Sequence, residues 1–219
     1  MSGSRARDPG VVTFDGPAAS GKSTAARRVA AALGVPFVSS GLLYRVATLL
    51  ATGAGVVLDD ADAVLSVLAT HAVELRPGLG GDAVRVDGED VTAALHSDAV
   101  DAAVSRVAAH PGVRAWVDAR LREMPRPFVI DGRDMGSVVF PEAAHKFYLT
   151  AAPEVRAARR VGERAADLAE VAEAIRRRDA LDARQLAPAG DAQHLDTSAL
   201  DLDEVVEWVL GRLSVAAST

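Results

Sequence analysis

The stretch GPAASGKST, Gly16–Thr24, decides how the rest of the chain is interpreted. It fits the pattern GxxxxGK[ST] of a phosphate-binding loop, in which glycines let the backbone approach phosphate and the next helix points its positive end at the anion. The apolar run VVTFD, Val11–Asp15, precedes it, and STAARRVAAALG, Ser23–Gly34, follows with helical spacing. The loop therefore has the strand–loop–helix context that nucleotide binding requires.

Each position of this loop has an expected role. Lys22 would reach the β- and γ-phosphates, and the Ser23 hydroxyl would ligate Mg²⁺. The chain contains only two lysines, Lys22 and Lys146, and otherwise uses arginine for positive charge. A lysine at position 22 therefore indicates a functional requirement for lysine rather than a chance occurrence. A glycine turn with a chance lysine is the alternative interpretation. The expected ATP-binding residues are Gly16, Pro17, Ala18, Ala19, Ser20, Gly21, Lys22, Ser23 and Thr24.

Composition excludes several classes of protein. The chain has 219 residues, of which 49% are hydrophobic, and this is enough for one domain with a sizeable core. A net charge of −6 without a basic stripe disfavours nucleic-acid binding. No apolar run reaches the length of a membrane span, and the polar N-terminus does not resemble a signal peptide. With no cysteine, thiol catalysis is excluded, and a cytoplasmic enzyme is expected.

The order of expected elements predicts the fold class. Apolar segments at 11–15, 35–40, 127–131, 145–152 and within 191–198 alternate with helical patterns, which predicts a parallel sheet covered on both faces. Two short alternating segments, 71–77 and 83–92, break this order and predict a small antiparallel ribbon inserted into the domain. The expected helix caps are Gly34, Ser39 or Ser40, and the capping pair of Asp201 and Glu204. Ligands of such a sheet bind beyond the carboxyl ends of its strands.

Polar side chains follow those strand ends and the next helices. Such a mixture suits phosphoryl transfer, because the protein mainly positions groups and neutralises charge in a loose transition state. Arginine holds phosphate oxygens bidentately, and a surplus of arginines outside the phosphate loop favours a kinase, which needs a second anion site for its acceptor. The residues are Ser40, Tyr44, Arg45, Asp131, Arg133, Asp134, Arg159, Arg160, Arg178, Asp182 and Arg184.

Position alone leaves alternatives for four of these residues. Asp131 ends an apolar strand, where a carboxylate could hold Mg²⁺ directly or through a water; a helix-capping or turn aspartate is the less favoured alternative. Arg133 could form an exposed ion pair. Arg159 and Arg160 could belong to a solvated helix face.

Five motifs together give the chain a close resemblance to a known family. They are SSGLLYR, VRVDGEDVT, SRVAAHPGVR, DGRDMGSVVFP and RRRDALD followed by AP. With the phosphate loop, they resemble the bacterial cytidylate kinases of the nucleoside monophosphate kinase superfamily over nearly the whole chain. The resemblance implies an α/β fold of the P-loop NTPase type, with three layers, a five-stranded parallel sheet, a small antiparallel acceptor-binding insert and a helical lid.

The resemblance also implies a division of the chain. Residues 1–219 would form a single kinase domain with a loose tail at 1–10. The acceptor-binding segment would span about 40–115, with the ribbon at about 72–92, and the lid would span about 157–180.

Roles carry over from the resemblance residue by residue. Ser105, Arg114 and Asp134 match positions that recognise cytosine, whose amino group suits an aspartate acceptor and whose O2 and N3 suit arginine or serine donors. The remaining matches are Arg45 and Arg133 to the acceptor phosphate, Arg178 and Asp182 to the ribose, and Arg159 to a lid arginine near the ATP phosphates. The chain departs from the family at Gln185, where an arginine is usual; Arg184 comes one residue early, and the lid is a few residues short.

The expected activity is therefore transfer of the γ-phosphate of ATP to CMP or dCMP, with Mg²⁺ as cofactor. Lys22, Arg133, Arg159 and Asp131 form the expected catalytic group, and a monomer is expected. One alternative is another small-molecule kinase that accepts UMP, AMP or a non-nucleotide. Another is a nucleotide-dependent switch, although the lack of asparagine excludes the NKxD motif of GTPases.

Overall fold

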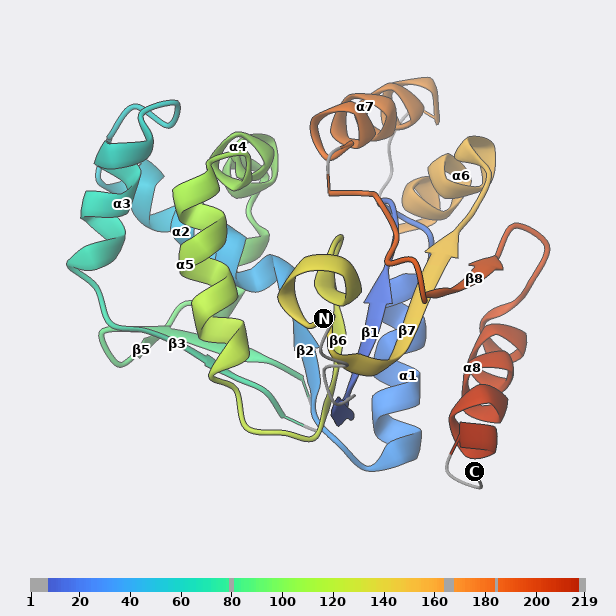
Figure 1. The fold of residues 1–219 in the computed structure, drawn as a ribbon. Helices are drawn as coiled ribbons and strands as arrows, with labels where there is room; N and C mark the ends of the chain where they lie inside the picture. Colours follow the sequence, from blue (N-terminus) through green and yellow to red (C-terminus); the bar gives the residue numbers. More distant parts are fainter. Residues whose placement is uncertain (1–7, 79–80, 164–167, 184, 217–219) are drawn as a thin grey trace, which may run out of the picture. The chain divides into compact units, whose positions relative to one another are not determined.

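The computed structural model describes residues 8–78, 81–163, 168–183 and 185–216 (Figure 1). The chain forms two compact units. Unit 1 consists of Met1–Val35 and Arg126–Thr219, and unit 2 consists of Pro36–Pro125.

The main sheet is parallel, as the sequence predicts, and its five strands have the order β2-β6-β1-β7-β8 (Figure 1). Helices flank this sheet, so the prediction of a three-layer α/β fold is confirmed. Unit 1 contributes four of its strands, β1 (Asp8–Asp15), β6 (Phe128–Asp131), β7 (Ala143–Thr150) and β8 (Gln193–Asp196). The helices of unit 1 are α1 (Lys22–Leu33), α6 (Pro153–Glu163), α7 (Leu168–Leu181) and α8 (Leu202–Ala216), with a π-helical turn, η2 (Met135–Val139).

The core of unit 1 is built on β1, which pairs in parallel with β6 on one side and β7 on the other. Helices cover both faces of a parallel sheet of this kind, so a central strand is buried on both faces, which explains why β1 is a nearly continuous apolar run. Phe14 is fully buried and lies 5.4 Å from Phe147 between ring centroids. The end of β1 is therefore a rigid base for the loop that follows.

Local sequence signals set the ends of two helices in unit 1. Gly34 ends α1 in the left-handed conformation, with φ of 68°, and its N–H bonds the carbonyls of Ala30 and Ala31. Asp201 and Glu204 form the expected capping box before α8, each side chain accepting a hydrogen bond from the other's backbone N–H at 2.9 Å. Both predicted caps are confirmed.

Unit 2 contains the predicted antiparallel ribbon as a separate sheet with the order β3-β4-β5. Its turn lies at Asp87 and Gly88, both with positive φ. The strands of this unit are β2 (Phe37–Ser39), β3 (Val73–Arg76), β4 (Ala83–Val86) and β5 (Glu89–Asp90). The helices are α2 (Gly41–Gly53), α3 (Ala61–Ala69), α4 (Asp98–Ala108), α5 (Pro111–Arg122) and the 3₁₀ helix η1 (Thr92–His96).

Two local expectations differ from the structure. β1 begins at Asp8, so the last three residues of the expected loose tail belong to a strand, because Asp8 pairs with Ala143 of β7. Ser40 stands at the start of α2, but its side chain makes no capping hydrogen bond because its backbone is already helical there, with φ of −59° and ψ of −29°. In the part of the chain that the structure describes, no helix has the length and apolarity to cross a bilayer.

Candidate active site

The phosphate loop has the backbone geometry that its glycines predict. Gly16, Ala19 and Gly21 all have positive φ, of 144°, 59° and 85°. A side chain at Gly16 would place its Cβ only 2.0 Å from the carbonyl oxygen of Leu149 on β7. Glycine is therefore required at position 16 both for the dihedral angle and for the close approach to β7.

Lys22 and Ser23 begin α1 inside this loop. The Lys22 side chain is buried and folds back so that its ammonium donates a hydrogen bond to the Pro17 carbonyl at 3.1 Å. The Ser23 hydroxyl donates to a carboxylate oxygen of Asp131, at the end of β6. Sequence reasoning assigned Ser23 and Asp131 to the same metal ion, and the structure brings them together.

The pair fits Mg²⁺ by its chemistry. Both groups are hard oxygen donors, and Mg²⁺ typically takes only one or two protein ligands, with waters and substrate phosphates completing its octahedron. Among the described residues, no cluster of three or more His, Cys, Asp or Glu side chains offers an alternative metal site. Ser23 and Asp131 are therefore the residues that would hold Mg²⁺ with a nucleotide.

Arg159 of α6 approaches the phosphate loop. Its guanidinium lies 3.6 Å from the point where a Cβ on Gly21 would be. It donates to the carbonyl of Thr197 at 2.7 Å and to the hydroxyl of Thr197 at 3.0 Å, and that hydroxyl bonds the carbonyl of Ser20. Thr197 thus holds the arginine and the loop together.

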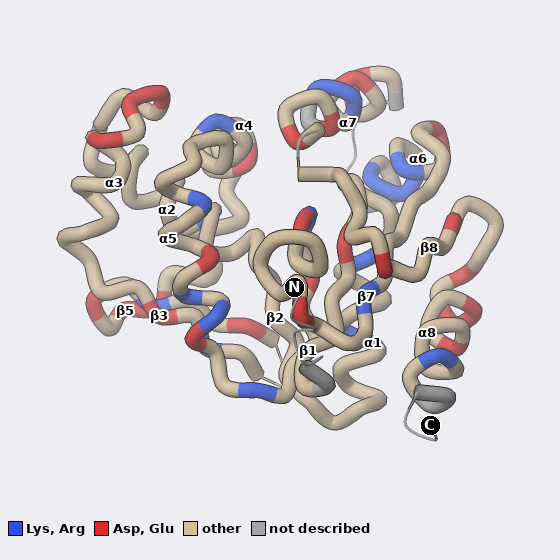
Figure 2. Tube along the Cα trace, in the orientation of Figure 1, with Lys and Arg blue, Asp and Glu red and all other residues tan. Residues whose placement is uncertain are grey.

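Arg133 follows β6 and also contacts the loop. It donates to the carbonyl of Gly16 at 3.1 Å and pairs with Asp182 at 2.9 Å, and both side chains of this pair are 17% exposed. Figure 2 shows basic residues on α6 and both signs of charge along α7. Arg156 of α6 is buried, pairs with Asp179 of α7 at 2.7 Å and donates to the carbonyl of Ala18 at 3.2 Å. Two arginines thus contact the phosphate loop while paired with carboxylates.

Asp134 and Asp15 are both buried near the loop, with 4% and 5% of their surfaces exposed. The Asp15 carboxylate accepts hydrogen bonds from the backbone N–H groups of Met135 at 2.8 Å and Gly136 at 2.7 Å. Burial raises the pKa of Asp15 to about 6; the bonds from Gly136 and Met135 oppose this shift, and the charge of Asp134 adds to it. A buried carboxylate therefore joins the end of β1 to the residues after Asp134.

Unit 2 holds the other expected acceptor residues. The Arg114 guanidinium lies over the Tyr44 ring, 5.5 Å from its centroid. Arg45 pairs with Asp101 of α4 at 2.6 Å and donates to the carbonyl of Leu95 at 2.8 Å. Ser105 lies one helical turn after Asp101 on α4, so these two side chains share a face of the helix. Ser40 is buried at the start of α2.

The side chains of two expected site residues, Arg178 and Arg184, are not among those that the structure describes. The structure places Arg178 within α7 but describes nothing of its side chain, and Arg184 lies outside the described residues altogether. The roles expected for these two arginines stay predictions.

The family model and the similar sequences agree on one family. A family model described as cytidylate kinase matches residues 12–214. A cytidylate kinase from Thermus thermophilus is 58% identical over 93% of this chain and 98% of its own length. The chain belongs to the cytidylate kinase family. A cytidylate kinase from Deinococcus radiodurans is 52% identical over 93% of this chain and 98% of its own length.

Membership of the cytidylate kinase family confirms the resemblance and the prediction of a kinase that phosphorylates a cytidine nucleotide. The crystal structure of an uncharacterised protein from Eubacterium ventriosum has a TM-score of 0.51 to this chain at 12% identity, covering 93% of this chain and 98% of that one. At that identity the likeness concerns the fold alone.

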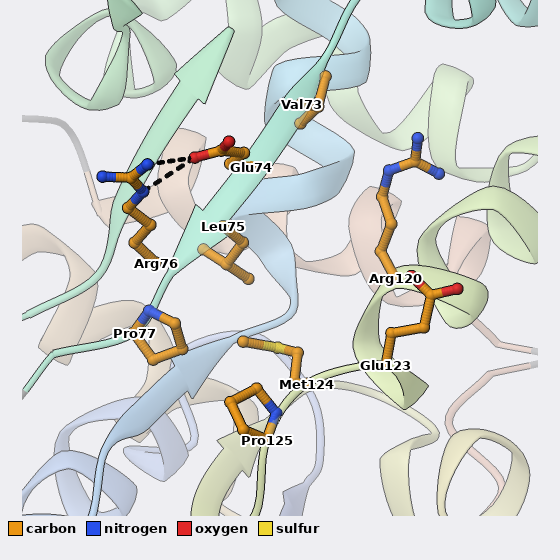
Figure 3. A pocket seen from close by; sticks show the side chains of 9 residues that line it. All are labelled: Val73, Glu74, Leu75, Arg76, Pro77, Arg120, Glu123, Met124 and Pro125. Carbon is orange, nitrogen blue, oxygen red and sulfur yellow. Dashed lines mark hydrogen bonds and ion pairs between the residues drawn. The ribbon is translucent and has the colours of Figure 1, made fainter. Parts of the chain in front are cut away.

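A pocket in unit 2 is separate from the residues expected to bind nucleotide. It has a volume of about 480 Å³ and lies between β3 and the end of α5 (Figure 3). Leu75, Met124 and Pro125 give it apolar walls, and Glu74 and Arg76 pair with each other at its edge. None of its lining residues is an expected ATP or CMP ligand, so it is not the candidate active site.

Sequence reasoning missed three residues that organise the site in this member of the cytidylate kinase family. Asp15, Arg156 and Thr197 each bond a backbone group of the phosphate loop or of the segment after Asp134. Asp15 directly precedes the loop and ends an apolar strand. This position could have indicated its role, because a charged residue is seldom buried without a partner. Nothing in the sequence distinguishes Arg156 and Thr197 from their neighbours.

Proposed function

We propose that the chain transfers the γ-phosphate of ATP to CMP or dCMP, giving ADP and CDP or dCDP, with Mg²⁺ as cofactor. The observation that carries this proposal is the 58% identity to a cytidylate kinase over 93% of the chain. The phosphate loop supports the proposal, because its backbone geometry is suited to the phosphates of a nucleoside triphosphate.

Unit 1 would supply the ATP side of the reaction. Backbone N–H groups of Gly16–Thr24 would hold the phosphates, and Lys22 would exchange the Pro17 carbonyl for phosphate oxygens. Ser23 and Asp131 would hold Mg²⁺, which neutralises charge on the β- and γ-phosphates when bound. Arg159, which already lies beside Gly21, would add positive charge at the transferring group.

The acceptor needs one set of residues for its phosphate and another for its base. Arg45 and Arg133 would bind the CMP phosphate, and Ser40 and Tyr44 would complete that part of the site. The remaining assignments are Ser105, Arg114 and Asp134 to cytosine and Arg178, Asp182 and Arg184 to the ribose and phosphate. A buried aspartate accepts from the cytosine amino group and would reject uracil, which presents an acceptor there.

The wider assignments remain part of the proposal. The acceptor-binding segment would span about 40–115 and the lid about 157–180. The enzyme would act as a cytoplasmic monomer whose partners are small nucleotides rather than nucleic acid or membrane.

Release of ADP from Mg-ATP tests the proposal, with CMP, dCMP, UMP, AMP or no acceptor in parallel reactions. Turnover with CMP and dCMP, and little with the others, is expected. Asp134→Ala should raise KM for CMP and leave KM for ATP nearly unchanged. Preference for another acceptor would overturn the cytosine assignment, and ADP formation without any acceptor would overturn the kinase assignment.

A further inference from the structure

The segment that carries Arg133 and Asp134 is anchored at both ends to two consecutive residues of β1. Before it, the Gly132 N–H donates to the carbonyl of Phe14 at 2.9 Å. After it, Met135 and Gly136 donate their N–H groups to the two carboxylate oxygens of Asp15. The first anchor is a backbone–backbone hydrogen bond that continues the pairing of β6 with β1, whereas the second depends on the side chain of Asp15.

The second anchor leaves the chain little room to move. Gly136 packs so closely on β1 that a Cβ would lie 2.8 Å from the Thr13 hydroxyl and 3.1 Å from Lys146. The Asp134 carbonyl accepts from the Val138 N–H at 2.9 Å, within the turn η2 that begins at Met135. The backbone on both sides of Asp134 is thereby fixed, and a side chain on a fixed backbone has few rotamers to choose from.

A carboxylate is the group that this anchor requires. Its two oxygens are both acceptors, so it can take two backbone N–H groups at once. An asparagine of the same shape would present an NH₂ group to one of those N–H groups and leave that donor unsatisfied in a buried place. Asp15 is 5% exposed, and a carboxylate is costly to bury, so an apolar or neutral residue would be expected there if the position served packing alone.

We propose that Asp15 is a positioning residue that sets the place of Asp134 through the backbone of Met135 and Gly136, and thereby controls selection of cytosine over uracil. This inference rests on the proposed function, since it requires Asp134 to read the base. Asp15 itself touches no part of the nucleotide in this scheme. It precedes Gly16 directly, so one residue joins the phosphate loop to the base-reading segment.

The test compares Asp15→Asn with Asp134→Ala and with the double variant. In Asp15→Asn, the ratio of kcat/KM for CMP to kcat/KM for UMP should fall about tenfold, because KM for CMP rises. A tenfold change is about the size expected for the loss of one hydrogen bond to a charged group. KM for ATP should change less than about threefold. In the Asp134→Ala background, Asp15→Asn should lower this ratio no further.

Asp60→Asn is the matched control. Asp60 caps α3 in unit 2 and also accepts two backbone N–H bonds, from Asp62 at 3.1 Å and Ala63 at 3.0 Å, but both fall on the single oxygen Oδ1, so asparagine removes the charge and keeps the bonds. This variant should keep the wild-type ratio. Amide hydrogen exchange gives a readout that does not depend on turnover, and Asp15→Asn should speed exchange at Met135 and Gly136.

The outcomes separate this inference from the proposed function. A wild-type enzyme without preference for cytosine would overturn the proposed function and this inference with it. A wild-type enzyme with that preference, but with effects of Asp15→Asn and Asp134→Ala that simply add, would overturn only the inference. Equal losses for CMP and ATP, or unchanged exchange at Met135 and Gly136, would also overturn it.

Discussion

The free energy of unfolding of Asp15→Asn, measured relative to that of the wild type, should increase as pH rises. The folded-state pKa of Asp15 is raised from 3.8 to about 6 because the carboxyl is buried. A raised pKa means that the folded state holds its proton longer than the unfolded state does. The stability contributed by the protonated form is therefore fully present below pH 3.8 and is lost as pH rises through about 6. Asparagine does not titrate and loses nothing in this window.

The magnitude follows from the size of the shift. A difference of about two pKa units corresponds to a total loss of about 3 kcal/mol, at roughly 1.4 kcal/mol for each unit. About half of this loss develops between pH 5 and pH 8, since the unfolded carboxyl is already ionised at pH 5 while the folded one is mostly protonated. Against it stands a constant cost of about 1–3 kcal/mol for the N–H group that asparagine leaves unsatisfied. The pH dependence, rather than the absolute difference, therefore carries the prediction.

Urea unfolding followed by tryptophan fluorescence measures this difference. Trp208 of α8 reports on unit 1, where its ring lies 6.0 Å from that of Phe147. A Trp116→Phe background removes the other tryptophan, which lies in unit 2. Between pH 5 and pH 8, the urea midpoint of Asp15→Asn should rise by about 0.5 M relative to that of the matched wild type, for a slope near 3 kcal/mol per molar.

Parallel midpoints across this pH range would refute the reasoning. They would mean that Asp15 has nearly the same pKa in the folded and unfolded states. A relative midpoint that falls with pH would mean that the bonds from Met135 and Gly136 outweigh burial and lower the pKa of Asp15. In Asp60→Asn both backbone bonds can stay, because a single oxygen, Oδ1, accepts them, so this variant shows what loss of an exposed carboxylate charge alone does to the midpoint.

Further predictions concern the chemistry and the packing. Lys22→Ala should lose on the order of 10³-fold in kcat, by analogy with arginine fingers, and near-normal turnover would contradict its role. Chelation of Mg²⁺ by EDTA should abolish ADP formation until excess Mg²⁺ restores it, and activity that persists would exclude the metal. Gly136→Ala should lower the free energy of unfolding by about 1–3 kcal/mol, because its Cβ would press on Thr13; an unchanged thermal midpoint would show that the turn can yield. Asp101→Asn should weaken binding of CMP several-fold because Arg45 loses its 2.6 Å partner, whereas tighter binding would show that Asp101 competes with phosphate.

The sequence predicts the fold and the ATP side of the site well, because their signals are local. A phosphate loop, its strand and its helix lie within about two dozen consecutive residues, and each has its own pattern. The meeting of Ser23 with Asp131 is also predictable, because carboxyl ends of parallel strands lie at one edge of the sheet. The capping box at Asp201 and Glu204 depends on two residues only three positions apart, and it is confirmed for the same reason.

The contacts that orient the site are not predictable in this way. Asp15 bonds residues 120 and 121 positions away, and Thr197 bonds a carbonyl 177 positions away. Their partners are backbone groups, which every residue carries, so no residue type marks the other end of the contact. Such contacts depend on the tertiary structure that brings the segments together.

The arginines show how a residue can satisfy two interpretations at once. Position alone left Arg133 open as either a phosphate ligand or a member of an ion pair, and in the structure it contacts both the loop carbonyl of Gly16 and the carboxylate of Asp182. Arg45 is likewise paired with Asp101. A guanidinium carries five N–H donors, so a phosphate can bind either arginine while the carboxylate keeps the donors that it already holds. The ion pair is then what aims the guanidinium before the phosphate arrives, and the two interpretations describe one arrangement.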